Sequence, residues 1–68
     1  MTLFEEVKEF VLTTFGEYSA GKVDIFAKEI NPELKPREFL DRCVDFISTM
    51  LGEKAAREKM KKFYEKYA

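Results

Sequence analysis

The chain has 68 residues, of which 46% are hydrophobic and 37% are charged, so its composition is that of a folded domain and not of a disordered segment. Its 12 basic and 13 acidic residues give a net charge of −1, which argues against a protein that binds nucleic acid through bulk positive charge. The length predicts a single domain, residues 1–68. Histidine is absent and Cys43 is the only cysteine, so we expect no metal site and no intrachain disulfide, and we expect no cofactor.

The first predicted element is a helix over residues 3–15. Its apolar residues recur at steps of three and four, the spacing that places side chains on one helix face: Leu3, Phe4, Val7, Phe10, Val11 and Phe15. Thr2 and Glu5 have the spacing of a capping box at its start. Gly16 is a typical stop at its end.

The stretch over residues 16–35 is less clearly patterned. Its first part contains three residues that are common in connections: Gly16, Ser19 and Gly21. Three apolar residues then follow at helical spacing: Val23, Phe26 and Ile30. They predict a connection over residues 16–22 and then a short helix that ends before Asn31-Pro32. Because the residues around Asp24 are weak helix formers, the alternative is an ordered extended loop over the whole stretch.

The third predicted element is a helix over residues 36–51, with Pro36 at its first position and Gly52 as its stop. It has a wide apolar face: Phe39, Leu40, Cys43, Val44, Ile47, Met50 and Leu51. Within this face Cys43 is expected to be a small buried hydrophobe and not a reactive thiol.

A last helix is predicted over residues 53–67, where alanine, glutamate and lysine favour helix and apolar residues recur at positions 56, 60, 63 and 67. Only Gly52 separates it from the preceding helix, so the two should fold back as a tight hairpin. The fold class is therefore all-α, a small bundle of three main helices with a short helix or ordered extended loop between the first two. The expected core includes Phe10, Phe39, Val44, Ile47 and Met60.

The last helix is the basic part of an otherwise acidic chain. Residues 1–52 hold six basic and ten acidic residues, net −4, whereas residues 53–68 hold six basic and three acidic residues, net +3. Around a helix these charges scatter: Lys54, Lys61 and Lys62 can cluster, while Lys59 and Lys66 face elsewhere. The pattern favours a solvated surface or attraction to an acidic protein partner, and neither direct nucleic-acid binding nor membrane binding.

Catalysis is not expected. The only candidate acid–base pairs, Glu5 with Glu9 and Asp41 with Asp45, lie four residues apart on helix faces, and such pairs are usually solvated. No small-molecule substrate is implied. The N-terminal segment lacks the basic and apolar regions of a signal peptide, and a lone cysteine fits a reducing compartment, so the expected location is cytoplasmic.

One short motif points to a partner. Met60, Phe63 and Tyr64 place an aliphatic and two aromatic side chains on one side of a helical turn, which would form an apolar plug for a pocket on another protein. The same spacing is also what a helix needs to pack on its own core. In sequence, the segment Arg57–Tyr64 resembles the PCNA-interacting peptide, with Arg57 at the position where that family has glutamine.

In size, helical organisation and incomplete motif, the chain resembles small archaeal inhibitors of the PCNA sliding clamp. The resemblance implies docking at the peptide pocket of the clamp through Arg57, Met60, Phe63 and Tyr64, and inhibition of clamp-dependent DNA replication. This hypothesis requires the aromatic residues to be partly exposed or the hairpin to open.

A second resemblance covers about a third of the chain. Lys35-Pro36-Arg37-Glu38-Phe39 and the segment Leu51-Gly52-Glu53-Lys54-Ala55-Ala56 are similar to small helical output domains of archaeal signalling proteins. It implies the alternative function, a helical signalling or dimerisation module with no enzymatic activity.

Overall fold

The computed structural model describes all of residues 1–68, and they form four helices and no strand. The helices are α1 (Leu3–Phe15), α2 (Glu17–Glu29), α3 (Pro36–Leu51) and α4 (Glu53–Tyr67). The all-α class is confirmed, and the bounds of three helices agree with those predicted. The number of full-length helices is four and not three.

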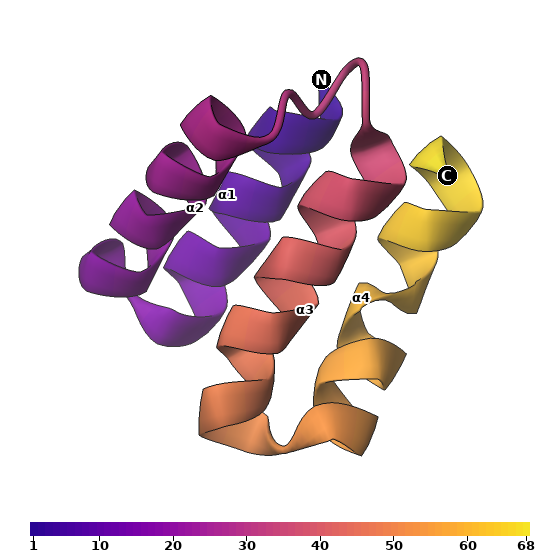
Figure 1. Ribbon diagram of the computed structural model, residues 1–68. Helices are drawn as coiled ribbons and strands as arrows, with labels where there is room; N and C mark the ends of the chain where they lie inside the picture. The colour runs from indigo at the N-terminus through magenta and orange to yellow at the C-terminus, as the bar shows by residue number, and fades with distance from the viewer.

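The helices pair as two antiparallel hairpins, α1 with α2 and α3 with α4 (Figure 1). One glycine makes the whole turn in each hairpin, Gly16 with a φ of 96° and Gly52 with a φ of 88°. This region of backbone conformation strongly favours a residue without a Cβ atom. Both turns lie at the same end of the bundle, while the segment that joins α2 to α3 crosses the opposite end (Figure 1).

Local hydrogen bonds define the remaining helix ends. The predicted capping box is present, with Thr2 Oγ1 accepting from Glu5 N–H and Glu5 Oε1 accepting from Thr2 N–H. The bond from the Thr2 N–H, together with one from the Thr2 hydroxyl to the same Glu5 oxygen, holds the pKa of Glu5 below its usual value. Between α2 and α3, the Asn31 carboxamide oxygen accepts from the backbone N–H groups of Glu33 and Leu34, at 2.8 and 3.1 Å. Pro36 then begins α3 as predicted.

The prediction for residues 16–35 was wrong in its first half. The stretch 17–22 is not a connection but the first half of a 13-residue helix, and the alternative of an extended loop is also wrong. The physical reason is tertiary: Ala20, Val23 and Phe26 all bury their side chains, and this burial outweighs the low helix propensity of the segment. Gly21, one of the residues that indicated a connection, is exposed to solvent within α2 and does not interrupt the helix.

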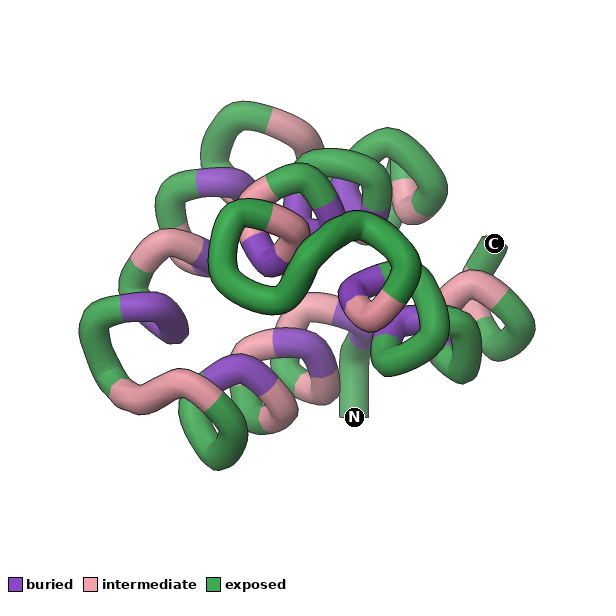
Figure 2. The backbone as a smooth tube through the Cα atoms, turned by 90° about the horizontal axis from the view of Figure 1, so that it is seen from below, coloured by how far each residue is buried: buried purple, intermediate pink, exposed green.

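The core is one cluster contributed by all four helices, and Figure 2 shows its buried residues on the sides of the helices that face one another. It consists of Leu3, Val7, Val11, Ala20, Val23, Phe26, Phe39, Leu40, Cys43, Val44, Ile47, Ala56, Met60 and Phe63. Four of the five predicted core residues belong to it. Phe10 is the exception, since it is only partly buried and packs against the edge of the cluster.

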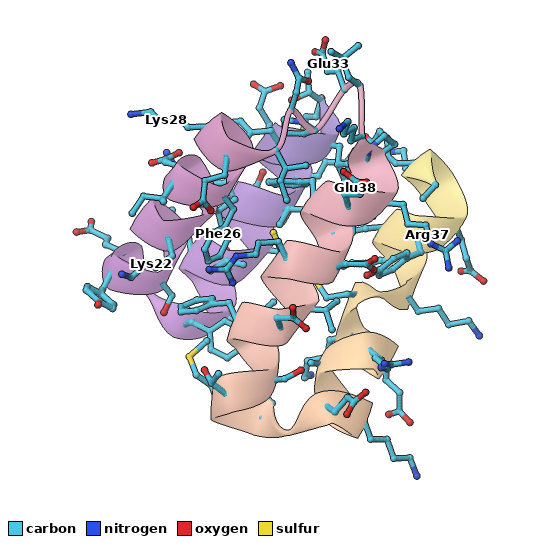
Figure 3. All side chains as sticks on the ribbon, in the orientation of Figure 1. Lys22, Phe26, Lys28, Glu33, Arg37 and Glu38 are labelled. Atoms are coloured by element: carbon cyan, nitrogen blue, oxygen red, sulfur yellow. The ribbon has the colours of Figure 1, made fainter.

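Aromatic pairs join the two hairpins on both sides of the bundle. On one side, Phe26 of α2 meets Phe46 of α3 with ring centroids 5.6 Å apart, and the Arg42 guanidinium lies 4.2 Å from the centroid of Phe26. Figure 3 shows Phe26 directed from α2 toward α3. On the other side, Phe10 of α1 meets Phe63 of α4 at 5.8 Å. The four helices therefore close into a ring in which α1 and α4 are neighbours.

Candidate functional site

The four predicted partner-binding residues lie on α4, but the structure divides them into two pairs. Met60 is fully buried and Phe63 is 3% exposed, so both side chains belong to the core. Tyr64 is half-buried and Arg57 is exposed. The three-residue plug is therefore not presented on the surface of the closed bundle, and the partial exposure on which the docking hypothesis depends holds only for Tyr64.

Tyr64 is held in place by a residue of the neighbouring helix. Its hydroxyl donates a hydrogen bond to Asp41 Oδ1 on α3 at 2.6 Å. Burial raises the pKa of the Tyr64 phenol above its usual value, and the acceptor carboxylate of Asp41 raises it further. The phenol is therefore a hydrogen-bond donor at neutral pH and fastens α4 to α3.

Arg57 stays on its own helix. Its guanidinium Nη2 lies 2.6 Å from Glu53 Oε1, one helical turn earlier, and both side chains are largely exposed. An exposed pair of this kind contributes little to stability. Arg57 is therefore free to exchange this partner for a carboxylate on another molecule.

A second tyrosine, which the sequence reading did not single out, fastens the end of α4. The Tyr67 hydroxyl contacts the Glu6 carboxylate of α1 and lies 3.3 Å from the carbonyl oxygen of Met1. Lys66 Nζ lies 3.0 Å from the same Glu6 carboxylate. The only signal in the sequence was the continuation of the apolar spacing to position 67, and nothing in the spacing predicts that Glu6 is the partner.

Two open grooves flank α4. The α3–α4 groove has a volume of about 700 Å³ and is lined chiefly by residues of both charges with one aromatic ring: Arg37, Asp41, Asp45, Arg57, Lys61 and Tyr64. Figure 3 shows the Arg37 side chain directed from α3 toward α4. This groove brings together Arg57 and Tyr64, the two accessible members of the predicted site.

The α1–α4 groove lies on the other side of α4 and has a volume of about 390 Å³. It is lined chiefly by two acidic residues of α1, two lysines of α4 and the two facing phenylalanines: Glu6, Glu9, Lys62, Lys66, Phe10 and Phe63. Lys62 Nζ lies 5.2 Å from the ring centroids of both Phe10 and Phe63. The floor is thus aromatic, with negative charge on one wall and positive charge on the other.

The expectation that Lys66 faces away from Lys62 was wrong. Lys61 lines the α3–α4 groove, whereas Lys62 and Lys66 together line the α1–α4 groove. Adjacent positions on a helix point about 100° apart, so Lys61 and Lys62 flank the outer face of α4 and line different grooves. The basic charge of α4 is thereby split between two surfaces.

Other candidate chemistry lies outside these grooves or is spread over the surface. Cys43 is buried as predicted, and burial raises the pKa of its thiol to about 12, so the reactive thiolate is not formed at neutral pH. The acidic pairs Glu5–Glu9 and Asp41–Asp45 are exposed. No group of three or more acidic or cysteine side chains is arranged to hold a metal ion. None of the four helices is both long and apolar enough to cross a membrane.

Comparisons with protein-family models, with curated proteins and with solved structures found no match to this chain.

Proposed function

We propose that this protein is a small helical interaction module that works by binding another protein and catalyses no reaction. The observation that carries the proposal is that the four predicted partner-binding residues of α4 fall into a buried pair and an accessible pair. Met60 and Phe63 complete the core, while Arg57 and Tyr64 remain accessible on the wall of an open groove. Binding to the closed bundle would then use the grooves beside α4 and not the apolar plug.

The chemistry of the two grooves supports binding over catalysis. Each groove is open to solvent and contains residue types that are enriched where proteins meet: Arg37, Arg57 and Tyr64 in the α3–α4 groove, and Phe10 in the α1–α4 groove. The one thiol lies in the core, where its raised pKa keeps it protonated. The exposed carboxylate pairs lack the dry surroundings that tune a general acid or base.

The proposal is tested with two adjacent substitutions that make the same charge change on opposite sides of α4. Lys61→Glu alters the α3–α4 groove and Lys62→Glu alters the α1–α4 groove. Binding of the wild-type chain to itself and to a purified PCNA-type clamp is measured by sedimentation and by calorimetry. We expect at least one of these to bind, and to lose affinity with one variant and not the other. Binding to neither probe, or binding that both variants leave unchanged, would contradict the proposal.

Docking on a PCNA-type sliding clamp is the second candidate, with inhibition of clamp-dependent DNA replication as its consequence. It is favoured by the helical conformation of residues 53–67, which keeps Met60, Phe63 and Tyr64 on adjacent turns of one helix. Because Met60 and Phe63 are buried, docking through them requires α4 to leave the bundle about the Gly52 turn. Opening would also break the hydrogen bond between Tyr64 and Asp41.

This mechanism makes a kinetic prediction. If α4 must open before the plug can bind, the observed association rate levels off with increasing clamp concentration, at the rate of opening. Tyr64→Phe removes a bond that holds α4 closed and should raise that limiting rate. A rate that rises linearly with clamp concentration, unchanged by Tyr64→Phe, would exclude docking through the buried residues.

A further inference from the structure

The side of the bundle formed by α1 and α4 is its most weakly closed side. The two hairpins are each held by a full helix–helix interface. In contrast, α1 and α4 meet chiefly through Phe10 against Phe63 and through the contacts of Glu6 with Lys66 and Tyr67. The remaining space is the α1–α4 groove, whose floor is the pair of aromatic rings. Because Phe63 is 3% exposed, the apolar surface that a partner can cover there is chiefly the partly buried Phe10 ring.

The two walls of the α1–α4 groove carry charges of opposite sign. The α1 wall of the groove carries Glu6 and Glu9, and the α4 wall carries Lys62 and Lys66. At the groove itself, Glu9 stands on the α1 wall and Lys62 on the α4 wall, and neither forms an ion pair within the chain. The surface is thus half negative and half positive, with unpaired charge in each half.

A surface with this division is complementary to itself. When two copies face each other across a two-fold axis that runs along the groove, α1 of one copy lies against α4 of the other, and the reverse contact is generated by symmetry. Each Glu9 then faces a Lys62 of the second copy, and the partly buried Phe10 rings of the two copies lie between these contacts. A two-fold axis across the groove would instead place α1 against α1 and α4 against α4, which like charges oppose.

We infer that the occupant of the α1–α4 groove is a second copy of this chain, docked with α1 against α4. The inference rests on the proposed function, since it names the partner of an interaction module. The bundle measures 27 × 23 × 20 Å, so one side offers an area of about 500 to 600 Å², below the roughly 800 Å² per partner of a standard stable interface. The dimer is therefore weak and reversible, as complexes with interfaces of this size are.

The dimer is tested by sedimentation of the full chain between about 5 µM and 2 mM, at low and high salt. We expect the mass to rise from monomer toward dimer, and high salt to shift the rise to higher concentration, because part of the attraction is between exposed charges. Lys62→Glu should weaken the dimer about tenfold or more, whereas Lys61→Glu, on the other side of α4, should change it less than about twofold.

Mixing two variants gives the sharpest form of the test. Glu9→Lys alone places lysine against Lys62 of the second copy, and Lys62→Glu alone places glutamate against Glu9, so each variant should remain monomeric. Mixed in equal amounts, they restore opposite charges at both contacts and should form a heterodimer about as tight as the wild-type dimer. A matched control pair, Glu33→Lys with Lys28→Glu, changes exposed residues of the α2–α3 end (Figure 3), and each of these variants should dimerise alone like the wild type.

The remaining outcomes overturn the inference. A monomeric wild-type chain at 2 mM, two groove variants that fail to combine, or control variants that behave like the groove variants would each show that the second copy is not the occupant. A chain that stays monomeric but binds the purified clamp would overturn the dimer alone and leave the proposed interaction function standing. A chain that does neither would contradict both.

Discussion

Phe63 and Tyr64 are adjacent aromatic residues on one helix, and the structure gives them opposite roles. Phe63 is 3% exposed and lies in the core with Met60, whereas Tyr64 lies in the wall of an open groove with its hydroxyl bonded to Asp41. An apolar triplet spaced i, i+3, i+4 therefore does not indicate which of its side chains is accessible to a partner. The inner face of α4 serves the fold, whereas Tyr64, on the side of α4 that faces α3, stays partly accessible.

The largest expected effect comes from truncation on the inner face. Phe63→Ala removes a buried ring and leaves a cavity, which should lower the free energy of unfolding by about 3 to 5 kcal/mol. A chain of this size has about 3 to 10 kcal/mol in total, so the variant should be largely unfolded at 37 °C. Thermal unfolding followed by circular dichroism measures this. The control Leu34→Ala, at a residue 80% exposed, should change stability by less than about 0.5 kcal/mol.

Substitution of Phe63 would therefore affect clamp binding through the stability of the fold. Loss of binding in a Phe63→Ala, Tyr64→Ala double variant would report unfolding and not a lost contact. A folded Phe63→Ala variant with nearly wild-type stability would instead show that the inner face is not part of the core.

The second effect is a loss of stability in alkaline solution. Burial raises the pKa of Cys43 from 9.0 to about 12, so above pH 9 the unfolded chain loses this proton while the folded chain keeps it. Stability therefore falls as pH rises, with a slope that approaches about 1.4 kcal/mol per pH unit between pH 9 and 12. Urea unfolding at a series of pH values measures the slope, and Cys43→Ala should make it clearly shallower. An equal slope in the two proteins would assign the alkaline loss to other groups.

How far the sequence predicts this molecule differs between its two hairpins. In α3 and α4, the regular apolar spacing, Pro36 and Gly52 together predict both helices and the turn between them. In the other hairpin, Gly16 ends α1 as predicted. However, Gly21 and the weak helix formers around Asp24 do not predict the full length of α2. Local propensity failed there because Val23 and Phe26 are stabilised by contacts with residues far away in the sequence.

The candidate site was predictable in part for a related reason. Helical periodicity correctly placed Met60, Phe63 and Tyr64 on neighbouring turns, but burial depends on which side meets the other hairpin. The polar contacts that fasten α4, from Tyr64 to Asp41 and from Tyr67 to Glu6, join residues 23 and 61 positions apart. No local pattern encodes such pairs. The first follows from the way α4 packs on α3 within one hairpin, and the second from the way the two hairpins dock.

A smaller loss of stability is expected from a substitution of Tyr64, on the side of α4 that faces α3. Tyr64→Phe keeps the ring and removes the hydrogen bond to Asp41, so it should lower the free energy of unfolding by about 1 kcal/mol. The matched control is Tyr18→Phe, at a tyrosine that is 78% exposed, which should have almost no effect. Equal effects of the two substitutions in urea unfolding would show that the bond to Asp41 does not hold α4 in place.

The smallest effect is expected at Arg57. Arg57→Ala removes an exposed ion pair with Glu53 within one helix and should change stability by no more than about 0.5 kcal/mol. The same variant is therefore suited to binding measurements, because any loss of affinity reports a lost contact. A stability loss above about 1 kcal/mol in urea unfolding would mean that Arg57 supports the fold and is not available to a partner.

Native-state hydrogen exchange of the α4 amides tests most directly whether the inner face belongs to the fold. We predict that the amides of Met60 and Phe63 exchange only when the whole chain unfolds, so that their opening free energy equals the global free energy of unfolding. An opening free energy lower by about 2 kcal/mol or more, shared along α4 and absent from α3, would contradict this account. It would show that α4 detaches on its own and can offer its apolar residues to another protein.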